Sequence, residues 1–316
     1  MLASQLTLGV LLAAAFGSAY AAEGKGGDPS KGQLIQAAES DYLPFGSGAA
    51  DIKVSTGNGL SKSINLDDGP VKYIRAKYGN APINGNDPYA NVDGTRNLQY
   101  LRLGDVKPVI GWFYNPTLGQ VWYENHHNNT EVYSVRQIAN PAIPAAPKFG
   151  GMIIAKVPTA ATNVFFGEWA PRTGNSNQIT NSTDLNMADG KRTVWYVGDN
   201  PTGNTTGVRT ATYNVLGINK HTPGQNDFYT GQVTATFGSG DKGSMSGELE
   251  HTDDGDLSFN GVEITNADGS FNSIPGRNNE GMTGHFYGNQ AAAMVGYTTR
   301  GTGNVGDDVA FGGAKK

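Results

Sequence analysis

Two adjacent histidines, His126 and His127, have the clearest chemical potential in this chain of 316 residues. An imidazole nitrogen can serve as an axial ligand to a haem iron, and flat apolar side chains can cover the macrocycle. The surrounding sequence supplies such side chains and an arginine suited to a haem propionate, namely Trp112, Tyr114, Trp122, Tyr123, Tyr133 and Arg136. The pattern therefore indicates a haem pocket in which His126 or His127 binds the iron.

The same residues also fit a surface turn rich in asparagine and histidine beside an ordinary aromatic core. Residue types alone favour that interpretation, so the haem pocket needs support from elsewhere in the chain. His221 is a further candidate for the iron, in the loop Asn219–Gly224, which we expect close to the same site. A plain exposed loop is the alternative for His221.

Few residues in the sequence are suited to catalysis. The chain has no cysteine and five histidines, and it lacks a Gly-x-Ser-x-Gly elbow, a His-Glu-x-x-His motif and a phosphate-binding glycine loop. We therefore expect a binding protein and not an enzyme. The net charge of −5, with 16% charged residues, argues against nucleic acid as a partner.

Residues 1–21 resemble a secretory signal peptide. Leu6 to Phe16 form a short apolar core, and Ala19-Tyr20-Ala21 gives the small-x-small cleavage pattern. Because no cysteine follows to carry a lipid, we expect export without a lipid anchor. The mature chain then begins at residue 22.

The part of the chain before residue 189 predicts a β-rich domain, residues 22–188, with many loops. Period-2 or apolar segments predict strands at residues 71–78, 98–103, 107–115, 119–125, 130–138, 152–157 and 162–169. Residues 23–65 are expected to be mostly loop, with a short helical turn within residues 30–37 and a weak strand at residues 52–54. Residues 79–96 form a long predicted loop because Gly, Asn, Asp and Pro dominate them.

Residues 189–316 predict an eight-stranded antiparallel β-barrel, so the fold class is all-β. The expected strands are residues 192–197, 208–217, 228–237, 244–249, 257–264, 282–287, 291–298 and 309–311. An apolar strand at the end of the chain would be a poor exposed edge, and pairing with an earlier strand closes the barrel.

Four stretches resemble the hemophilin group, soluble relatives of the transferrin-binding-protein-like surface lipoproteins. They are Thr162–Trp169, Arg192–Thr202, Ala211–Asn219 and Gly284–Gly296. The resemblance covers roughly residues 150–316 and implies an N-terminal handle domain that captures haem b (iron protoporphyrin IX) as cargo through histidine. It supplies no ligand motif that matches residue by residue.

The resemblance also implies partners. These are an outer-membrane TonB-dependent receptor that takes the haem and a surface lipoprotein assembly modulator (type XI secretion) that exports the chain. We accordingly expect a secreted, monomeric protein of iron acquisition, exported across the outer membrane of a Gram-negative bacterium. The alternative is a surface or secreted module that binds a host protein without haem, with residues 79–96 and 200–207 as its contact surface.

Overall fold

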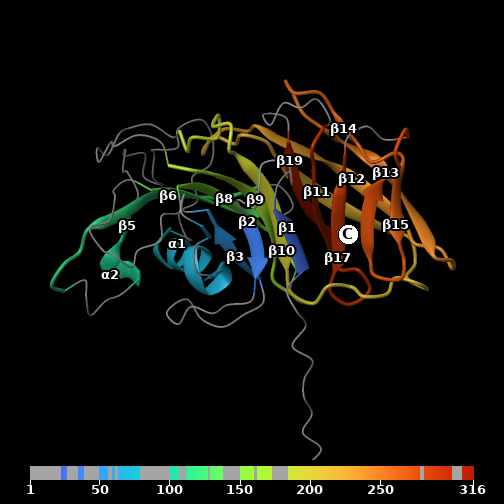
Figure 1. Ribbon diagram of the computed structural model, residues 1–316, viewed down its shortest axis with the longest axis horizontal. Coiled ribbons are helices and arrows are strands. Elements are labelled where there is room, and N and C mark those ends of the chain that lie inside the picture. The colour runs from blue at the N-terminus through green and yellow to red at the C-terminus, as the bar shows by residue number, and fades with distance from the viewer. Residues whose placement is uncertain are drawn as a thin grey trace, which may run out of the picture.

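A seven-stranded antiparallel sheet forms one end of the molecule in the computed structural model, and a closed barrel forms the other (Figure 1). The structure describes residues 23–26, 35–38, 50–55, 59–60, 63–78, 100–106, 112–126, 129–137, 150–159, 162–172, 184–277, 281–300 and 308–316. The predicted signal peptide, the loop of residues 79–96 and His127 lie outside them. Among the described residues, no helix has the length and apolar character to cross a membrane.

The first sheet has the order β1-β10-β9-β8-β7-β6-β5. Its strands are β1 (Glu23–Gly26), β5 (Tyr100–Arg102), β6 (Thr117–Asn125), β7 (Glu131–Gln137), β8 (Gly151–Lys156), β9 (Val164–Ala170) and β10 (Thr193–Gly198). From β6 to β10 the strands follow one another in sequence, so each strand pairs with the one before it in the chain. Strand β1, the first described strand in the sequence, pairs with β10, so residues about 170 positions apart in the chain become neighbours.

A second, three-stranded sheet covers one face of the first, together with helices. It consists of β2 (Ile35–Ala38), β3 (Asp51–Val54) and β4 (Ile64–Asn65). The weak strand expected at residues 52–54 is confirmed as β3, but β1, β2 and β4 were not expected in residues 23–65. These three strands have only two to four residues each, too few to show a clear pattern. The helical turn expected within residues 30–37 was wrong at residues 35–37, which belong to β2, and its remaining residues lie outside the described ones.

The strand expected at residues 71–78 is instead a helix. A π-helical turn, η2 (Asp67–Val71), leads into α1 (Lys72–Tyr78), and Asn65 Oδ1 accepts a hydrogen bond of 2.8 Å from the Asp68 backbone N–H. Val71 and Ile74 are buried, three residues apart on one helical face. The sequence contains one signal of a helix start here, the acidic pair Asp67 and Asp68 in the first turn.

The third correction concerns residues 98–116. The strand expected at residues 98–103 is confirmed over β5 (Tyr100–Arg102), but Leu103 already begins α2 (Leu103–Val106), and residues 98–99 lie outside the described ones. Residues 112–116 are not a strand, although one was expected through residue 115.

The barrel has eight strands, as predicted, and all its pairings are antiparallel. They are β11 (Ala211–Ile218), β12 (Phe228–Thr236), β13 (Lys242–Glu250), β15 (Val262–Thr265), β16 (Ser270–Ser273), β17 (Thr283–Tyr287), β18 (Ala293–Thr298) and β19 (Val309–Lys315). The last strand pairs with β11 and closes the barrel, which confirms the expected role of the C-terminus. A two-residue strand, β14 (Leu257–Ser258), pairs with β13.

One member of the barrel differs from the prediction. Residues 192–197, expected as its first strand, form β10 and pair with β9 in the first sheet. The missing barrel strand is β16, whose short sequence Ser-Phe-Asn-Ser carries one apolar residue. The chain thus leaves the first sheet at Gly198, while the predicted domain limits of 22–188 and 189–316 stay a prediction.

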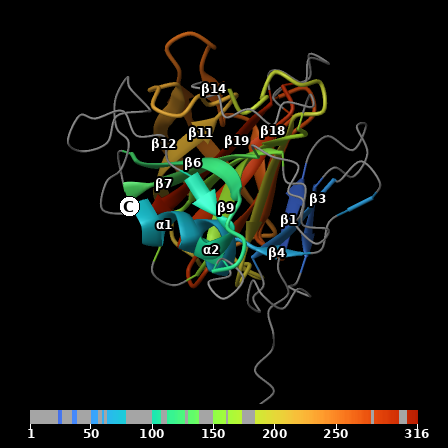
Figure 2. The same cartoon turned by 90° about the vertical axis from the view of Figure 1, so that its left-hand side faces the viewer.

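Three apolar clusters divide the core between these layers. Aromatic and aliphatic side chains such as Phe237, Phe286 and Phe311 fill the barrel interior. One face of the seven-stranded sheet packs under α1 and the small sheet. Its other face packs on the outside of the barrel through β9 and β10 against β18 and β19. Figure 2, seen from the sheet end, shows α1 and α2 in front of the sheet and the barrel behind it.

Glycine permits the close approach of the two layers. A Cβ atom added to Gly312 of β19 would lie 2.5 Å from Cδ1 of Phe166 and 2.6 Å from Cγ1 of Val295. Phe166 is fully buried on β9, so its ring has no free space to move into. The final Phe-Gly-Gly of the chain therefore has a packing role.

We predict that Gly312→Val lowers the free energy of unfolding by about 1–3 kcal/mol, because overpacking forces the sheet away from the barrel. Thermal or urea unfolding measures the change. Gly240→Val is the matched control, since a Cβ atom there meets no heavy atom within 4 Å. Equal stability of the two variants would contradict this account of the interface.

Candidate functional site

Two glutamates project from the barrel-facing side of the seven-stranded sheet. Glu124 on β6 shares its face with Trp122, and Glu168 on β9 shares its face with Phe166, because side chains two residues apart lie on one side of a strand. Both carboxylates are buried. A buried carboxylate is stable only with hydrogen-bonding or charged partners, and the barrel supplies several of them.

Glu168 forms a buried ion pair with Arg192, at 2.5 Å between Oε2 and Nη2. Arg192 also donates to the Asp308 backbone oxygen at 2.9 Å, next to β19. Glu168 also accepts hydrogen bonds from the loop after β11, where the backbone N–H groups of Lys220 and His221 donate to it at 2.9 and 2.8 Å. Glu168 thus joins the sheet to the barrel.

His221 lies between two carboxylates. Its Nε2 is 2.8 Å from Glu124 Oε2, and its Nδ1 contacts Asp227 Oδ1. Gly224 and Thr222 add backbone hydrogen bonds of 2.9 Å to Glu124 and Asp227 respectively. We call this group, Glu124, Glu168, Asp227, Arg192 and His221, the carboxylate clasp.

The contacts within the carboxylate clasp shift the pKa values of His221 and Glu124. Burial alone would lower the pKa of His221, but the charges of Glu124 and Asp227 and their hydrogen bonds raise it to about 10. Burial alone would raise the pKa of Glu124, but His221 and His126 lower it to about 2. Both ring nitrogens of His221 therefore carry protons at neutral pH, and neither offers a lone pair to a metal.

His126 lies beside the clasp. The Phe228 ring packs against both imidazoles, with centroid distances of 4.1 Å to His126 and 4.2 Å to His221. The two imidazole centroids are 6.4 Å apart, and His126 Nε2 is 3.7 Å from Glu124 Oε1. The predicted proximity of His126 and His221 is thus present, in a packed arrangement.

The structure does not gather the aromatic side chains that were expected to enclose haem. Trp122 is buried against the barrel, while Tyr123 and Tyr133 are buried on the opposite face of the sheet, where both hydroxyls donate to Glu131. Arg136 pairs with Gln120 on β6. Within the described part of the chain, no group of three or more His, Asp or Glu side chains is arranged to hold a metal ion.

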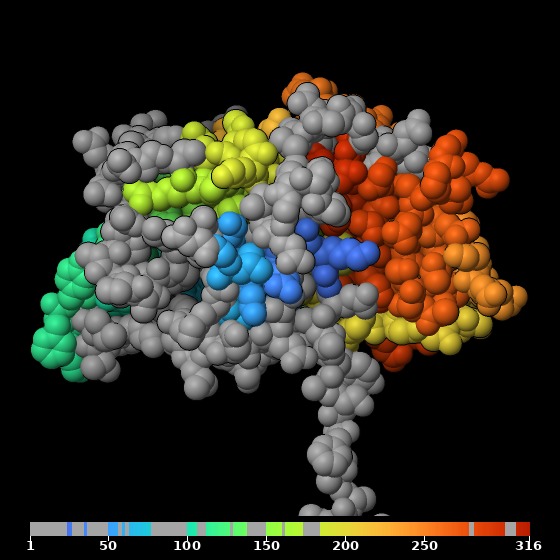
Figure 3. Space-filling model, viewed as in Figure 1, coloured from blue at the N-terminus to red at the C-terminus, as the bar shows by residue number. Residues whose placement is uncertain are grey.

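The other predicted wall residues lie at the far end of the sheet. Trp112 is 82% exposed and Tyr114 is 49% exposed, and between them Phe113 is 88% exposed. These three residues, the aromatic tip, follow α2 and precede β6 near the outer edge strand β5. Figure 3 shows the green atoms of this region at the edge of the molecule opposite the orange and red barrel.

Hydrogen bonds at its base hold the aromatic tip in place. Leu103 donates its backbone N–H to the Pro116 oxygen at 3.0 Å, and Gly104 donates to Asn115 Oδ1 at 2.8 Å. These bonds tie the segment after the tip to α2. The sequence predicted that Trp112 and Tyr114 line a haem pocket. Their exposure instead shows that they lie on the surface.

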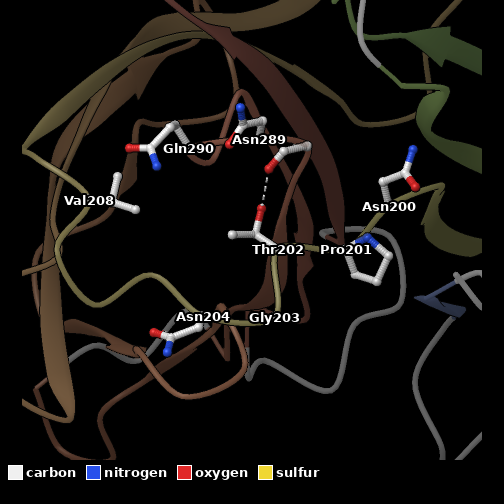
Figure 4. Close-up of a pocket in the computed structure, with 9 residues that line it drawn as sticks. Asn200, Pro201, Thr202, Gly203, Asn204, Val208, Asn289 and Gln290 are labelled. Atoms are coloured by element: carbon white, nitrogen blue, oxygen red, sulfur yellow. Dashed lines mark hydrogen bonds between the residues drawn. The ribbon is translucent and has the colours of Figure 1, made fainter. Parts of the chain in front are cut away.

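The alternative contact surface, residues 200–207, lies at one end of the barrel. There it borders a hollow together with the turn between β17 and β18 (Figure 4). The other predicted contact segment, residues 79–96, lies outside the described residues.

No protein-family model matches the sequence. No curated protein matches it either. The chain is similar to several solved structures, the first described only as a surface lipoprotein, with 15% identity and a TM-score of 0.33 over 64% of this chain and 100% of the other.

Two further similar structures are of Transferrin Binding Protein B. A double mutant of the Haemophilus parasuis protein shares 12% identity, with a TM-score of 0.33 over 62% of this chain and 39% of that one. The isotype 1 protein of serogroup B Neisseria meningitidis shares 13% identity, with a TM-score of 0.30 over 64% of this chain and 53% of that one. The chain thus spans about half or less of these two proteins, and at such low identity and TM-score the likeness assigns neither a family nor a ligand.

We predict that Glu124→Gln lowers the free energy of unfolding by about 3 kcal/mol near pH 6, because it leaves the His221 imidazolium with one carboxylate fewer. The pH dependence changes too. Since the folded pKa of Glu124, about 2, lies below its usual 4.5, wild type loses this stabilisation as the pH falls from 4.5 towards 2. For His221, raised from 6.5 to about 10, stabilisation is complete below pH 6.5 and is lost as the pH rises towards 10.

Urea unfolding at a series of pH values checks both statements. The variant should lose part of the acid dependence between pH 4.5 and 2. Glu248→Gln, which changes an exposed carboxylate on β13, should leave stability within about 0.5 kcal/mol of wild type. An unchanged acid slope in Glu124→Gln would show that the clasp does not depend on the charge of Glu124.

Proposed function

We propose that this protein is a secreted or surface-acting binding module that recognises another protein through the aromatic tip. The observation that carries the proposal is the exposure of Trp112, Phe113 and Tyr114, three consecutive aromatic side chains. Water disfavours such a cluster, and exposed apolar patches of this kind mark interaction sites. Trp and Tyr are enriched among the residues that dominate protein interfaces.

The tip also has the rigidity that an interface anchor needs. Its base is tied by backbone and side-chain hydrogen bonds to α2, and Leu103 of α2 is buried. A fixed aromatic side chain loses little conformational freedom on binding, since only two side-chain torsions must be ordered. Burying one such ring removes about 150–250 Å² from water, which at about 25 cal/mol per Å² corresponds to about 4–6 kcal/mol before the costs of association.

The barrel lies away from the tip, and its described interior is packed with side chains. Its interior is occupied by the side chains of its own strands, Phe237, Phe286 and Phe311 among them. Recognition is therefore assigned to the outer surface. Export through a signal peptide, use of a surface lipoprotein assembly modulator and a monomeric state belong to the same proposal.

Haem capture is the competing proposal, with delivery to a TonB-dependent receptor. The nearness of His126 and His221 supports it, and the engagement of both His221 nitrogens by carboxylates counts against it. The buried Nε2 of His126 would also have to move before it could reach an iron. The protein-binding proposal is therefore preferred.

We predict that the double substitution Trp112→Ala, Phe113→Ala weakens the capture of a host protein. The mature protein is immobilised and host serum proteins are passed over it, and the captured protein is identified by mass spectrometry and titrated. The double variant should bind it at least about 30-fold more weakly, the effect of losing about 2 kcal/mol at an interface hot spot. Its melting temperature should match wild type because both side chains are exposed.

The matched control changes two exposed residues of the barrel, Gln232→Ala and Glu248→Ala, which face each other across β12 and β13. It should bind like wild type. Equal binding by the tip variant would place the contact elsewhere, and failure to capture any saturable partner would count against the proposal.

We predict that titration of the mature protein with haemin gives no saturating one-to-one shift of the Soret band. The His221 nitrogens are protonated, and the aromatic side chains around His126 are already packed. His126→Ala and His127→Ala serve as controls. A saturating shift that either substitution removes would establish haem capture and displace the present assignment.

A further inference from the structure

The hollow at the end of the barrel has a volume of about 480 Å³, in the range of small-molecule sites. Two segments far apart in sequence form it, residues 200–208 and the β17–β18 turn. Figure 4 shows Gln290, Val208, Asn204 and Thr202 around its rim. Val208 belongs to the apolar cluster that fills the barrel, so the hollow lies above a closed floor.

Backbone hydrogen bonds hold the two segments together. Thr202 donates its N–H to the Phe286 oxygen, and Gly288 donates its N–H to the Asn200 oxygen, both at 2.8 Å. The Thr202 hydroxyl donates to the Gly288 oxygen at 2.8 Å as well. Because these N–H groups already donate within the protein, they cannot pair with an added peptide strand. Side chains must therefore recognise the ligand.

Strained backbone lies around the hollow. Gln290 and Ala291 have φ values of 56° and 54°, a left-handed conformation that is costly for residues other than glycine and asparagine, and Asn200 has a φ of 53°. Within the turn, Tyr213 donates its hydroxyl to the Ala291 oxygen at 2.7 Å, and Lys315 Nζ donates to the Gln290 oxygen at 3.2 Å. The fold therefore enforces this turn from inside the barrel and from β19. Strain of this kind gathers at binding sites.

The lining carries no charged side chain. It offers the amides of Asn200, Asn204, Asn289 and Gln290, together with the apolar surfaces of Val208 and Pro201. Asn204 Oδ1 accepts the Thr206 backbone N–H at 2.8 Å, which leaves its amide NH₂ to donate to a ligand. Gln290 forms no side-chain hydrogen bond with the described part of the chain and is exposed, so its amide can both donate and accept.

We propose that this hollow binds a neutral saccharide unit. A sugar hydroxyl both donates and accepts, as an amide does, and a pyranose ring has an apolar face that suits the apolar part of the lining, Pro201 and the exposed edge of Val208. Ionic ligands find no counter-charge in the lining. The saccharide comes either from a free sugar or from a glycan on another molecule. The hollow is on the barrel and the aromatic tip is at the other end of the molecule, so this inference is independent of the proposed function.

Gly203 provides a test that spares the fold. It lines the hollow, and a Cβ atom added there meets no heavy atom within 4 Å. Gly203→Trp should therefore fill the hollow without disturbing the barrel. Gly190→Trp is the matched control, because Gly190 is equally unobstructed and precedes β10, at the opposite end of that strand from Asn200.

Saturation-transfer NMR on the mature protein, with glucose, galactose, mannose, N-acetylglucosamine, lactose and maltose as probes, measures binding. We expect saturable binding of at least one sugar, at least tenfold weaker in Gly203→Trp and unchanged in Gly190→Trp. The Trp112→Ala, Phe113→Ala protein should bind the sugar like wild type. No saturable binding of any probe, or equal binding in the two tryptophan variants, overturns the proposal.

A second arm separates the sources of the sugar. A desialylated serum glycoprotein is tested before and after enzymatic removal of its N-glycans, with the same two tryptophan variants. Binding that deglycosylation and Gly203→Trp both remove identifies a glycan ligand. Binding of free sugars alone identifies a free saccharide, and glycoprotein binding that persists in Gly203→Trp overturns the proposal for glycans.

Discussion

Two buried glutamates on the barrel-facing side of a β-sheet, Glu124 and Glu168, depend on partners that the barrel provides. Neither carboxylate could be removed from water alone, since an unpaired buried charge costs several kcal/mol. The loop after β11 supplies an imidazolium and three backbone N–H groups, and Arg192 supplies the second cation. The sheet and the barrel are thus joined by polar contacts, which require a specific geometry. An apolar interface, which is less directional, joins them as well.

The apolar interface requires that the backbones of the sheet and the barrel approach each other closely. Phe166 packs directly over Gly312, and the Tyr287 ring packs so near Gly198 that a Cβ atom there would lie 2.6 Å from Cε1. Small residues on one layer therefore receive large rings from the other. This arrangement fixes the sheet against the outer wall of β18 and β19, and it leaves both far ends of the molecule free.

Those two ends differ in chemistry. The sheet end carries three exposed aromatic side chains, suited to an apolar contact with a protein. The barrel end carries an uncharged, amide-lined hollow, suited to a hydroxyl-rich ligand. A rigid body with unlike surfaces at opposite ends can engage two ligands without competition, and neither surface needs the barrel interior.

The sequence by itself determined the all-β class, the eight-stranded barrel and its closure by the last strand, because alternating apolar residues and Gly-rich turns are local signals. The acidic pair Asp67 and Asp68 and the spacing of Val71 and Ile74 also indicate a helix, although the alternation of apolar and basic residues in 71–78 favours a strand. Three features depend on the tertiary structure: β10 belongs to the sheet, both ring nitrogens of His221 face carboxylates, and Trp112 is exposed while Trp122 is buried. The physical reason is that strand partners, pKa and exposure depend on residues distant in the chain, and the local pattern around each residue carries no record of them.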